Sequence, residues 1–160
     1  TGLRVGIATA KGICFGTGLP LILIPTLEIL AQAGFSSIRE EQAFYLPMLD
    51  ARRMEVYAAL YNGTMQAIHP AEACILDQSS FGTWQSDDKP VYYFGSGSNK
   101  WADICNAEKF FHTQVNMSAV DMLNSAYVKF EAKEFSSIIS ATPLYLKNPN
   151  ITTPKAKLTY

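Results

Sequence analysis

Residues 44–64, FYLPMLDARRMEVYAALYNGT, decide the fold because they contain two strands and the turns that follow each of them. Residues 53–61 alternate in polarity, as expected of a strand with one buried face. The apolar positions of this alternation are Met54, Val56, Ala58 and Leu60. The run FYLPML at 44–49 predicts the partner strand, and residues 50–52 predict a tight turn between the two. The stretch therefore predicts an antiparallel hairpin.

The chain that follows extends this hairpin. Asn62 and Gly63 predict a second turn because both residues tolerate positive φ, and a third strand over residues 64–69 completes an antiparallel meander. We expect a short helix around residues 70–81. Residues 117–135 carry apolar side chains at helical spacing and predict the longest helix of the chain.

The chain that precedes the hairpin has an α/β pattern. Residues 1–20, TGLRVGIATAKGICFGTGLP, predict a helix that ends near Gly16 to Gly18, where flexible residues suit a C-cap. The apolar run LILI at 21–24 predicts a buried parallel strand. A second helix is expected to begin at Pro25 and to end at Gly34.

Three antiparallel strands followed by α/β elements are the plan of one lobe of the ribonuclease H-like, actin-like ATPase fold. The sequence therefore predicts an α/β protein that holds the second lobe of this fold and the remainder of the first. We assign residues 1–35 to the remainder of the first lobe, with a partner-facing helix, and residues 44–141 to the second lobe. Residues 142–160 form a C-terminal tail rich in Pro, Thr and Lys.

Composition excludes several classes of protein. The chain has 160 residues, 48% of them hydrophobic, and a formal net charge of −1, which opposes both disorder and a strongly basic nucleic-acid surface. Its three cysteines form no CxxC motif, so neither a disulfide framework nor a zinc site is expected and a cytoplasmic location is favoured. Arg4, Lys11 and the glycine content oppose a membrane-spanning first helix.

The first helix is unusually rich in glycine. Small residues recur every four positions in two series, and each interior glycine costs about 1 kcal/mol relative to alanine. The series are Gly2, Gly6 and Ala10, and Ala8, Gly12 and Gly16. Such a helix is expected to be packed against closely. Two interpretations remain open: a core helix of its own domain, or a helix half buried in its own domain and half in a partner subunit.

Two turns are candidate anion sites. Asp50 ends the first strand of the hairpin and is followed by Arg52 and Arg53, whose guanidinium groups can meet phosphate or carboxylate. The alternative is that Asp50 caps the turn and the arginines are solvated. GSGSNK at 95–100 follows the apolar strand VYYF, so Gly95 and Gly97 are further candidates for anion or nucleotide contact. The alternative there is a turn that only requires positive φ.

The chain carries no recognisable catalytic motif. His69 and His112 are not part of an HxxxH or HExxH pair, and they are interpreted as structural, so no metal site is expected. There is no GxSxG elbow, and no Cys has a His close to it in sequence. We therefore expect no catalytic residues.

Four segments carry a resemblance to a known family: TGLRVGIATAKGICFG, PLILIPTLEILA, PMLDARRMEVYAALY and PLYLKNPNITTPK. Together they closely resemble the TsaB, or YeaZ, family of bacterial tRNA threonylcarbamoyladenosine biosynthesis proteins, long grouped with glycoprotease-like peptidases. The resemblance runs from the first residue to about Lys155. In that family the TGLR motif follows a nucleotide-fold N-terminus, so the resemblance implies a chain truncated at its N-terminus.

The resemblance implies a noncatalytic scaffold or activator that pairs with TsaD, the subunit that holds the metal and modifies adenosine at position 37 of tRNA. The ATPase TsaE joins them, tRNA is met only through the complex, and TsaB forms a homodimer when alone. The helix that matches residues 1–15 belongs to the family's interface. By position, interface status is carried over to Gly2, Arg4, Ile7, Ala8 and Lys11.

The resemblance implies no cofactor in this stretch of chain, and a nucleotide only at the partner interface of the full-length protein. Two other functions remain open. An actin-like nucleotide-binding phosphotransferase or ATPase would use Asp50 and residues 95–97. A glycoprotease-like peptidase is supported only by the family's older name.

Overall fold

The computed structural model of the chain describes residues 2–84 and 87–147. Its centre is a five-stranded mixed sheet of order β3-β2-β1-β4-β5. β1, β2 and β3 form the antiparallel meander, while β4 runs parallel to β1 and β5 parallel to β4. The strands span Phe44–Asp50, Glu55–Asn62, Ala67–Ile75, Val91–Phe94 and Phe110–His112. The meander predicted from residues 44–64 is confirmed.

The third strand differs from its prediction. It begins three residues later than expected, at Ala67, and continues to Ile75. The short helix expected around residues 70–81 is therefore wrong, because half of that stretch pairs with β2. Residues 78–83 then form turns that lead to β4.

The turn between β2 and β3 forms for a reason other than the predicted one. The Asn62 side-chain Oδ1 accepts hydrogen bonds from the backbone of Thr64 and Gln66, and the residue with positive φ is Met65, at 62°. Gly63 is required by contact instead, since a Cβ there would lie 2.0 Å from the carbonyl oxygen of Glu41. The position of the turn is confirmed, and its expected positive φ at Asn62 and Gly63 is wrong.

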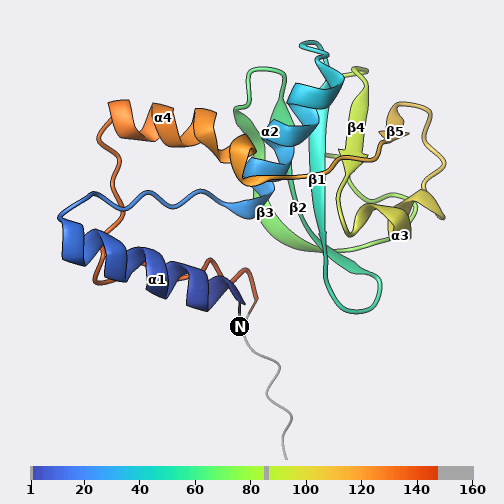
Figure 1. The fold of residues 1–160 in the computed structure, drawn as a ribbon. Helices are drawn as coiled ribbons and strands as arrows, with labels where there is room; N and C mark the ends of the chain where they lie inside the picture. Colours follow the sequence, from blue (N-terminus) through green and yellow to red (C-terminus); the bar gives the residue numbers. More distant parts are fainter. Residues whose placement is uncertain (1, 85–86, 148–160) are drawn as a thin grey trace, which may run out of the picture.

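One face of the sheet is covered by α2, Thr26–Ile38 (Figure 1). Gly34 lies against β4, where an added Cβ would meet the Phe94 ring at 2.2 Å, so the helix can approach the sheet closely. The helix does not end at Gly34 as expected but continues to Ile38, and Arg39 caps it with φ 58°. At this end the Tyr45 hydroxyl donates to the carbonyl oxygen of Glu40.

The opposite face packs on α3, Ser98–Ala102, and on the loop after β3. Trp101 of α3 is fully buried there, and its indole nitrogen donates to the carbonyl oxygen of Asp77 at 3.0 Å. Phe81, Tyr93 and Phe110 surround it with ring centroids 4.8–5.0 Å away. We call residues 26–112, which hold the sheet, α2 and α3, the sheet body.

Residues 2–25 and 119–147 form a second region, the helical arm, and residues 113–118 link the sheet body to it. The arm contains α1, Gly2–Thr17, a short 3-10 helix, Ala119–Met122, and α4, Leu123–Glu131. Figure 1 shows α1 and α4 on the same side of the sheet body, joined to it by extended segments.

The arm confirms one sequence prediction and corrects two. α1 is confirmed as a helix, and with 16 residues it is longer than α4, which has nine, so the helix over residues 117–135 is shorter than expected. The strand expected at residues 21–24 is wrong. That run forms only one antiparallel bridge, between Leu21 and Ser136.

The division into residues 1–35, 44–141 and 142–160 stays a prediction. α2 packs on β1, so it lies with the sheet body in space. Of the predicted C-terminal tail, residues 142–147 lie alongside α1, and the remainder falls outside the described residues.

Candidate functional site

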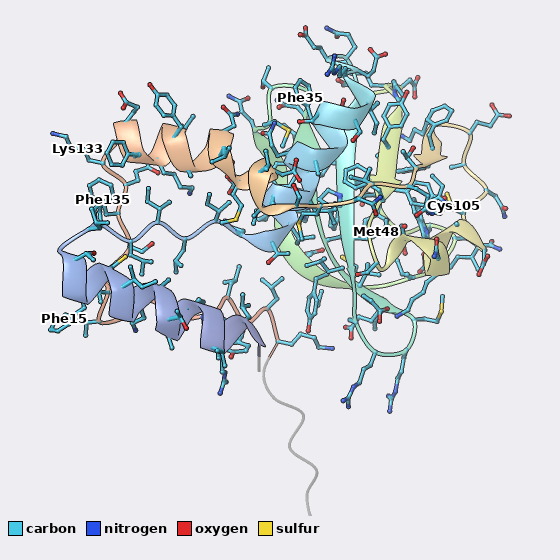
Figure 2. The ribbon with its side chains drawn as sticks, in the orientation of Figure 1. Phe15, Phe35, Met48, Cys105, Lys133 and Phe135 are labelled. Carbon is cyan, nitrogen blue, oxygen red and sulfur yellow. The ribbon has the colours of Figure 1, made fainter. Side chains whose placement is uncertain are left out.

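α1 exposes most of its apolar side chains. Only Cys14 is buried along the helix, and Phe15 is 82% exposed. Figure 2 shows Phe15 at the end of α1 farthest from the sheet body. The other exposed apolar residues of the helix are Leu3, Val5 and Ile13, each 58–59% exposed. Such a set of apolar side chains on one element is typical of an interaction surface.

The glycines of α1 are equally open. A Cβ added at any of four positions, Gly2, Gly6, Gly12 and Gly16, would meet nothing within 4 Å. The tight packing that the sequence predicts is therefore not made by the part of the chain that the structure describes. Among the described residues α1 is therefore not packed as a core helix, and its packing against a partner stays a prediction.

The other side of α1 faces residues 136–147, which we call the C-terminal strap. Lys11 Nζ donates to the carbonyl oxygens of Ile139, at 3.1 Å, and Ala141, at 3.2 Å. Arg4 Nε donates to the Tyr145 hydroxyl, and the guanidinium carbon lies 5.3 Å from the centroid of the same ring. These contacts hold the polar side of the helix against the strap.

A hollow of about 250 Å³ lies between α1 and the strap. Four of the five interface residues carried over from the family, Arg4, Ile7, Ala8 and Lys11, line it together with strap residues 141–143 and Tyr145. Gly2, the fifth, is exposed at the start of the helix. The structure thus brings four of the five together, but against the chain's own C-terminal segment.

The turn between β1 and β2 is organised around Lys100 of α3. Its ammonium group forms an ion pair with Asp50 and donates to the carbonyl oxygens of Ala51, Arg53 and Glu55. The backbone amide of Asp50 donates to Ser96 Oγ at 3.0 Å. The turn therefore presents carbonyl oxygens and one carboxylate to a cation that the chain itself supplies.

The arginines of this turn are solvent-exposed. Arg52 and Arg53 are both exposed, and Arg53 has φ 67°, which closes the turn. Sequence reasoning identified Asp50 but missed Lys100, although it lies in the GSGSNK motif. The contacts that Lys100 makes to main-chain oxygens 45–49 residues away have no signature in the sequence.

The glycines of GSGSNK serve packing against β1. Gly95 has φ 104°, and a Cβ there would meet the Met48 carbonyl oxygen at 2.4 Å. A Cβ at Gly97 would meet the Val56 side chain at 2.7 Å, and the Gly97 amide donates to the same Met48 oxygen. Gly95 has the positive φ that is expected if GSGSNK is a turn and not an anion site.

The predicted actin-like fold implies a site for a nucleotide phosphate at these turns. The amides of Asp50, Ala51 and Gly97 all donate to acceptors within the chain, so these turn amides do not point at an open position for phosphate. The residues present do not fit a phosphate cradle built from backbone amides. Nucleotide contact at Asp50, Arg52, Arg53, Gly95 and Gly97 stays a prediction.

Ser98 and His112 form the pair most like a nucleophile and its base. Ser98 Oγ lies 2.9 Å from His112 Nε2, and it donates a hydrogen bond to the Gly95 carbonyl oxygen at 2.8 Å. The Ser98 hydroxyl is thus already hydrogen-bonded to the main chain. Ser98 is also 1% exposed, so a substrate has no access to the oxygen. The pair therefore has a structural role in joining β5 to α3.

The thiol of Cys74 on β3 is equally unsuited to nucleophilic chemistry. Burial, together with the carboxylate of Glu72, raises the pKa of Cys74 to about 12. At neutral pH the sulfur is therefore a thiol and not the reactive thiolate.

Across residues 2–84 and 87–147, no group of three or more His, Cys, Asp or Glu side chains lies close enough to hold a metal ion. No helix in these ranges has the length and the apolar character that a membrane span requires.

The mixed sheet, with its meander, the two parallel strands beside it and the helices on both faces, defines an α/β protein of the actin-like, ribonuclease H-like class. Two solved structures from Pseudomonas aeruginosa share this fold. One is an uncharacterized protein with similarity to peptidase YEAZ, with a TM-score of 0.77 and 22% identity. The other is YeaZ, with a TM-score of 0.74 and 21% identity. Each comparison covers 91% of this chain and 68% of the other.

The chain belongs to the family described as TsaD: tRNA N6-adenosine threonylcarbamoyltransferase, whose model matches residues 1–153. Its curated relatives are tRNA threonylcarbamoyladenosine biosynthesis proteins TsaB, so the resemblance to TsaB and YeaZ is confirmed. It is 28% identical to the Escherichia coli protein over 154 residues, 92% of this chain and 66% of that protein. It is 30% identical to the Bacillus subtilis protein over 102 residues, 59% of this chain and 41% of that protein. The chain thus spans less than two thirds of the length of these relatives.

Proposed function

We propose that the chain is a noncatalytic scaffold and activator in the synthesis of tRNA N6-threonylcarbamoyladenosine, and that it pairs with TsaD through α1. The names of the TsaB relatives and the family model support the pathway. The observation that carries the pairing is the surface of α1. A Cβ added at any of its glycines would meet nothing within 4 Å, and four of its apolar side chains, Leu3, Val5, Ile13 and Phe15, are each more than half exposed.

The chemistry of this surface suits another helix. Glycines spaced by four residues leave shallow channels through which a second helix can approach close to the backbone. Full burial of a side chain such as Leu3, Ile13 or Phe15 contributes about 1.5–3 kcal/mol. Three such residues on one helix are enough to offset part of the cost of association.

The interior of the sheet body supports a role without chemistry of its own. The Ser98 hydroxyl is buried and its proton is engaged, and the Cys74 thiol has a raised pKa. Neither of these two groups is activated as a nucleophile. Activity of the complex would then reside in TsaD, and this chain would stabilise TsaD in its active arrangement.

The same proposal extends to the other partners. A TsaE homologue joins the pair, tRNA reaches this chain only through the complex, and in the absence of TsaD the open face of α1 pairs with a second copy. Any nucleotide would lie at the partner interface of the full-length protein.

The test is association of this chain with the TsaD homologue of its own organism, measured by co-purification and by calorimetry. Gly6→Leu and Gly12→Leu place bulk on the open side of α1, where an added Cβ meets nothing within 4 Å, and are expected to weaken association at least tenfold. Glu108→Leu adds a similar apolar side chain to an exposed loop beside β5, at the far end of the sheet body, and is expected to leave association unchanged. Unchanged affinity in both α1 variants would overturn the proposal.

A further inference from the structure

Among the residues that the structure describes, α1 makes few contacts with the sheet body. In this part of the chain the helix has no extensive contact with any strand or with another helix. Its described neighbours are the segment that follows it in the chain and the C-terminal strap. Within the described chain, the contacts that fix the angle and depth of α1 relative to the sheet are made by these two segments.

The first residue of the strap, Ser136, is joined to the segment that follows α1. The backbone amide of Ser136 donates to the carbonyl oxygen of Leu21 at 2.7 Å, in an isolated antiparallel bridge. Leu21 is buried, although it belongs to the segment between α1 and α2. The strap and that segment are thereby joined four residues beyond the end of α1.

A second set of contacts joins the strap to α1 itself. Residues 137–141 form a turn in which the Ala141 amide donates to the Ser137 carbonyl oxygen. The carbonyl oxygens of Ile139 and Ala141 converge on Lys11 Nζ, which has no carboxylate partner among the residues that the structure describes. Arg4, about two helical turns before Lys11, holds the Tyr145 side chain.

The end of the strap is fastened to the sheet body. Lys147 Nζ lies 2.7 Å and 2.9 Å from the two carboxylate oxygens of Glu55, at the start of β2. The Glu55 side chain is only 17% exposed, so the pair is shielded from solvent on one side. The carbonyl oxygen of Glu55 also accepts from Lys100, which ties this point to α3.

We infer that Lys147 and Glu55 are positioning residues for α1: their ion pair docks the strap, and with it the partner-facing helix, on the sheet body. Arg4 and Lys11 hold the helix to the strap, so their role is internal and they do not serve as partner contacts. The partner is left with the glycine-lined, apolar side of α1. The inference that these residues serve partner binding rests on the proposed function, whereas the docking of α1 by the strap does not.

The test is a charge swap read by hydrogen exchange of the whole chain. Glu55→Lys and Lys147→Glu each place like charges together and are expected to raise exchange of the α1 amides about fivefold. The double variant restores the pair with reversed signs and is expected to return exchange to the wild-type rate. Lys89→Glu, at the other end of the sheet body, is the control and is expected to leave α1 unchanged.

Exchange in β1 and β2 shows that each variant remains folded. Unchanged α1 exchange in both single variants, or no recovery in the double variant, would overturn the inference. Lys147→Met provides a second measurement, because loss of an exposed ammonium group at the end of the strap cannot disrupt the sheet core. It is expected to raise α1 exchange as well, and a wild-type rate would count against the inference.

Affinity for the TsaD homologue separates this inference from the proposed function. If both hold, the single variants lose affinity about threefold and the swap restores it. If exchange responds as expected while wild-type chain and TsaD fail to associate, the strap docks α1 but the proposed function is wrong. If association is normal and exchange does not respond, the proposed function stands and the positioning role is wrong.

Discussion

The sheet body and the helical arm differ in how they are stabilised. In the sheet body, aromatic and aliphatic side chains are fully buried on both faces of the sheet, and Trp101 is closed in by three aromatic rings. In the arm, α1 buries one residue and α4 buries none. The 3-10 helix of the arm packs on α2, whereas α1 and the strap are held by hydrogen bonds from Arg4 and Lys11 and by the ion pair of Lys147. The body supplies its own core, whereas the arm is the part of the molecule with apolar surface left for others.

The largest effect expected from this comparison is at the aromatic side chains. Trp101→Ala removes a fully buried indole and is expected to lower the free energy of unfolding by about 3–5 kcal/mol. Phe15→Ala removes a ring that is 82% exposed and is expected to change it by less than about 0.5 kcal/mol. Urea denaturation followed by circular dichroism measures both. Equal losses would contradict the division into body and arm.

A matched pair of glycines gives the next largest effect, with opposite signs. Gly34→Ala forces a Cβ to within 2.2 Å of the Phe94 ring and is expected to destabilise the fold by about 1–3 kcal/mol. Gly6→Ala meets no atom within 4 Å and is expected to stabilise α1 by up to about 1 kcal/mol. Stability of the body comes from chemical denaturation and that of α1 from hydrogen exchange. A stabilising Gly34→Ala would show that α2 does not pack as described.

Lys100→Met should have an intermediate effect, confined to the body. It keeps the apolar stem of the side chain but removes the ammonium group from Asp50 and from the Ala51 and Arg53 carbonyl oxygens, which is expected to cost about 1–3 kcal/mol. Lys89→Met removes an exposed lysine whose partner, Asp87, lies 3.4 Å away, and little change is expected. Thermal denaturation compares the two variants. Similar melting temperatures would mean that the β1–β2 turn does not depend on Lys100.

Alkaline pH should produce the smallest effect. Burial raises the pKa of Tyr61 from 10.0 to about 12 and that of Cys74 from 9.0 to about 12. Between these values the folded chain keeps protons that the unfolded chain releases. The contribution of the two groups to the free energy of unfolding is therefore fully present below pH 9 and is lost as the pH rises toward 12. The double variant Tyr61→Phe and Cys74→Ala is expected to reduce this slope in a series of melting temperatures. If the melting temperature of the double variant falls with pH as steeply as that of the wild type, groups other than Tyr61 and Cys74 cause the fall.

The sequence predicted the parts of the fold that depend on local periodicity. Alternation over residues 53–61 located β2, and the end of α1 followed from its glycines. The apolar run at 21–24 was misjudged because periodicity does not separate a buried strand from an extended segment that makes a single bridge. In the sequence Gly34 looks like the end of a helix, because the reason for a glycine there, contact with the ring of Phe94, lies sixty residues away.

The candidate site was less accessible to sequence reasoning. The spacing of small residues in α1 is visible in the sequence, and it predicts close packing that the described chain does not provide. The contacts of the strap are not visible in the sequence, because Arg4 and Tyr145 are 141 positions apart and Lys11 binds main-chain oxygens that every residue has. Lys100 likewise binds main-chain oxygens in the β1–β2 turn. Contacts of this kind are set by the tertiary fold and leave no pattern of residue types.

Hydrogen exchange of the full chain, with and without the TsaD homologue of the same organism, tests most directly that α1 is the partner-facing element. The account predicts that TsaD slows exchange of the amides of Gly2–Thr17 and leaves β1, β2 and β3 unchanged. Protection confined to the sheet body, or no protection anywhere at saturating TsaD, would contradict it.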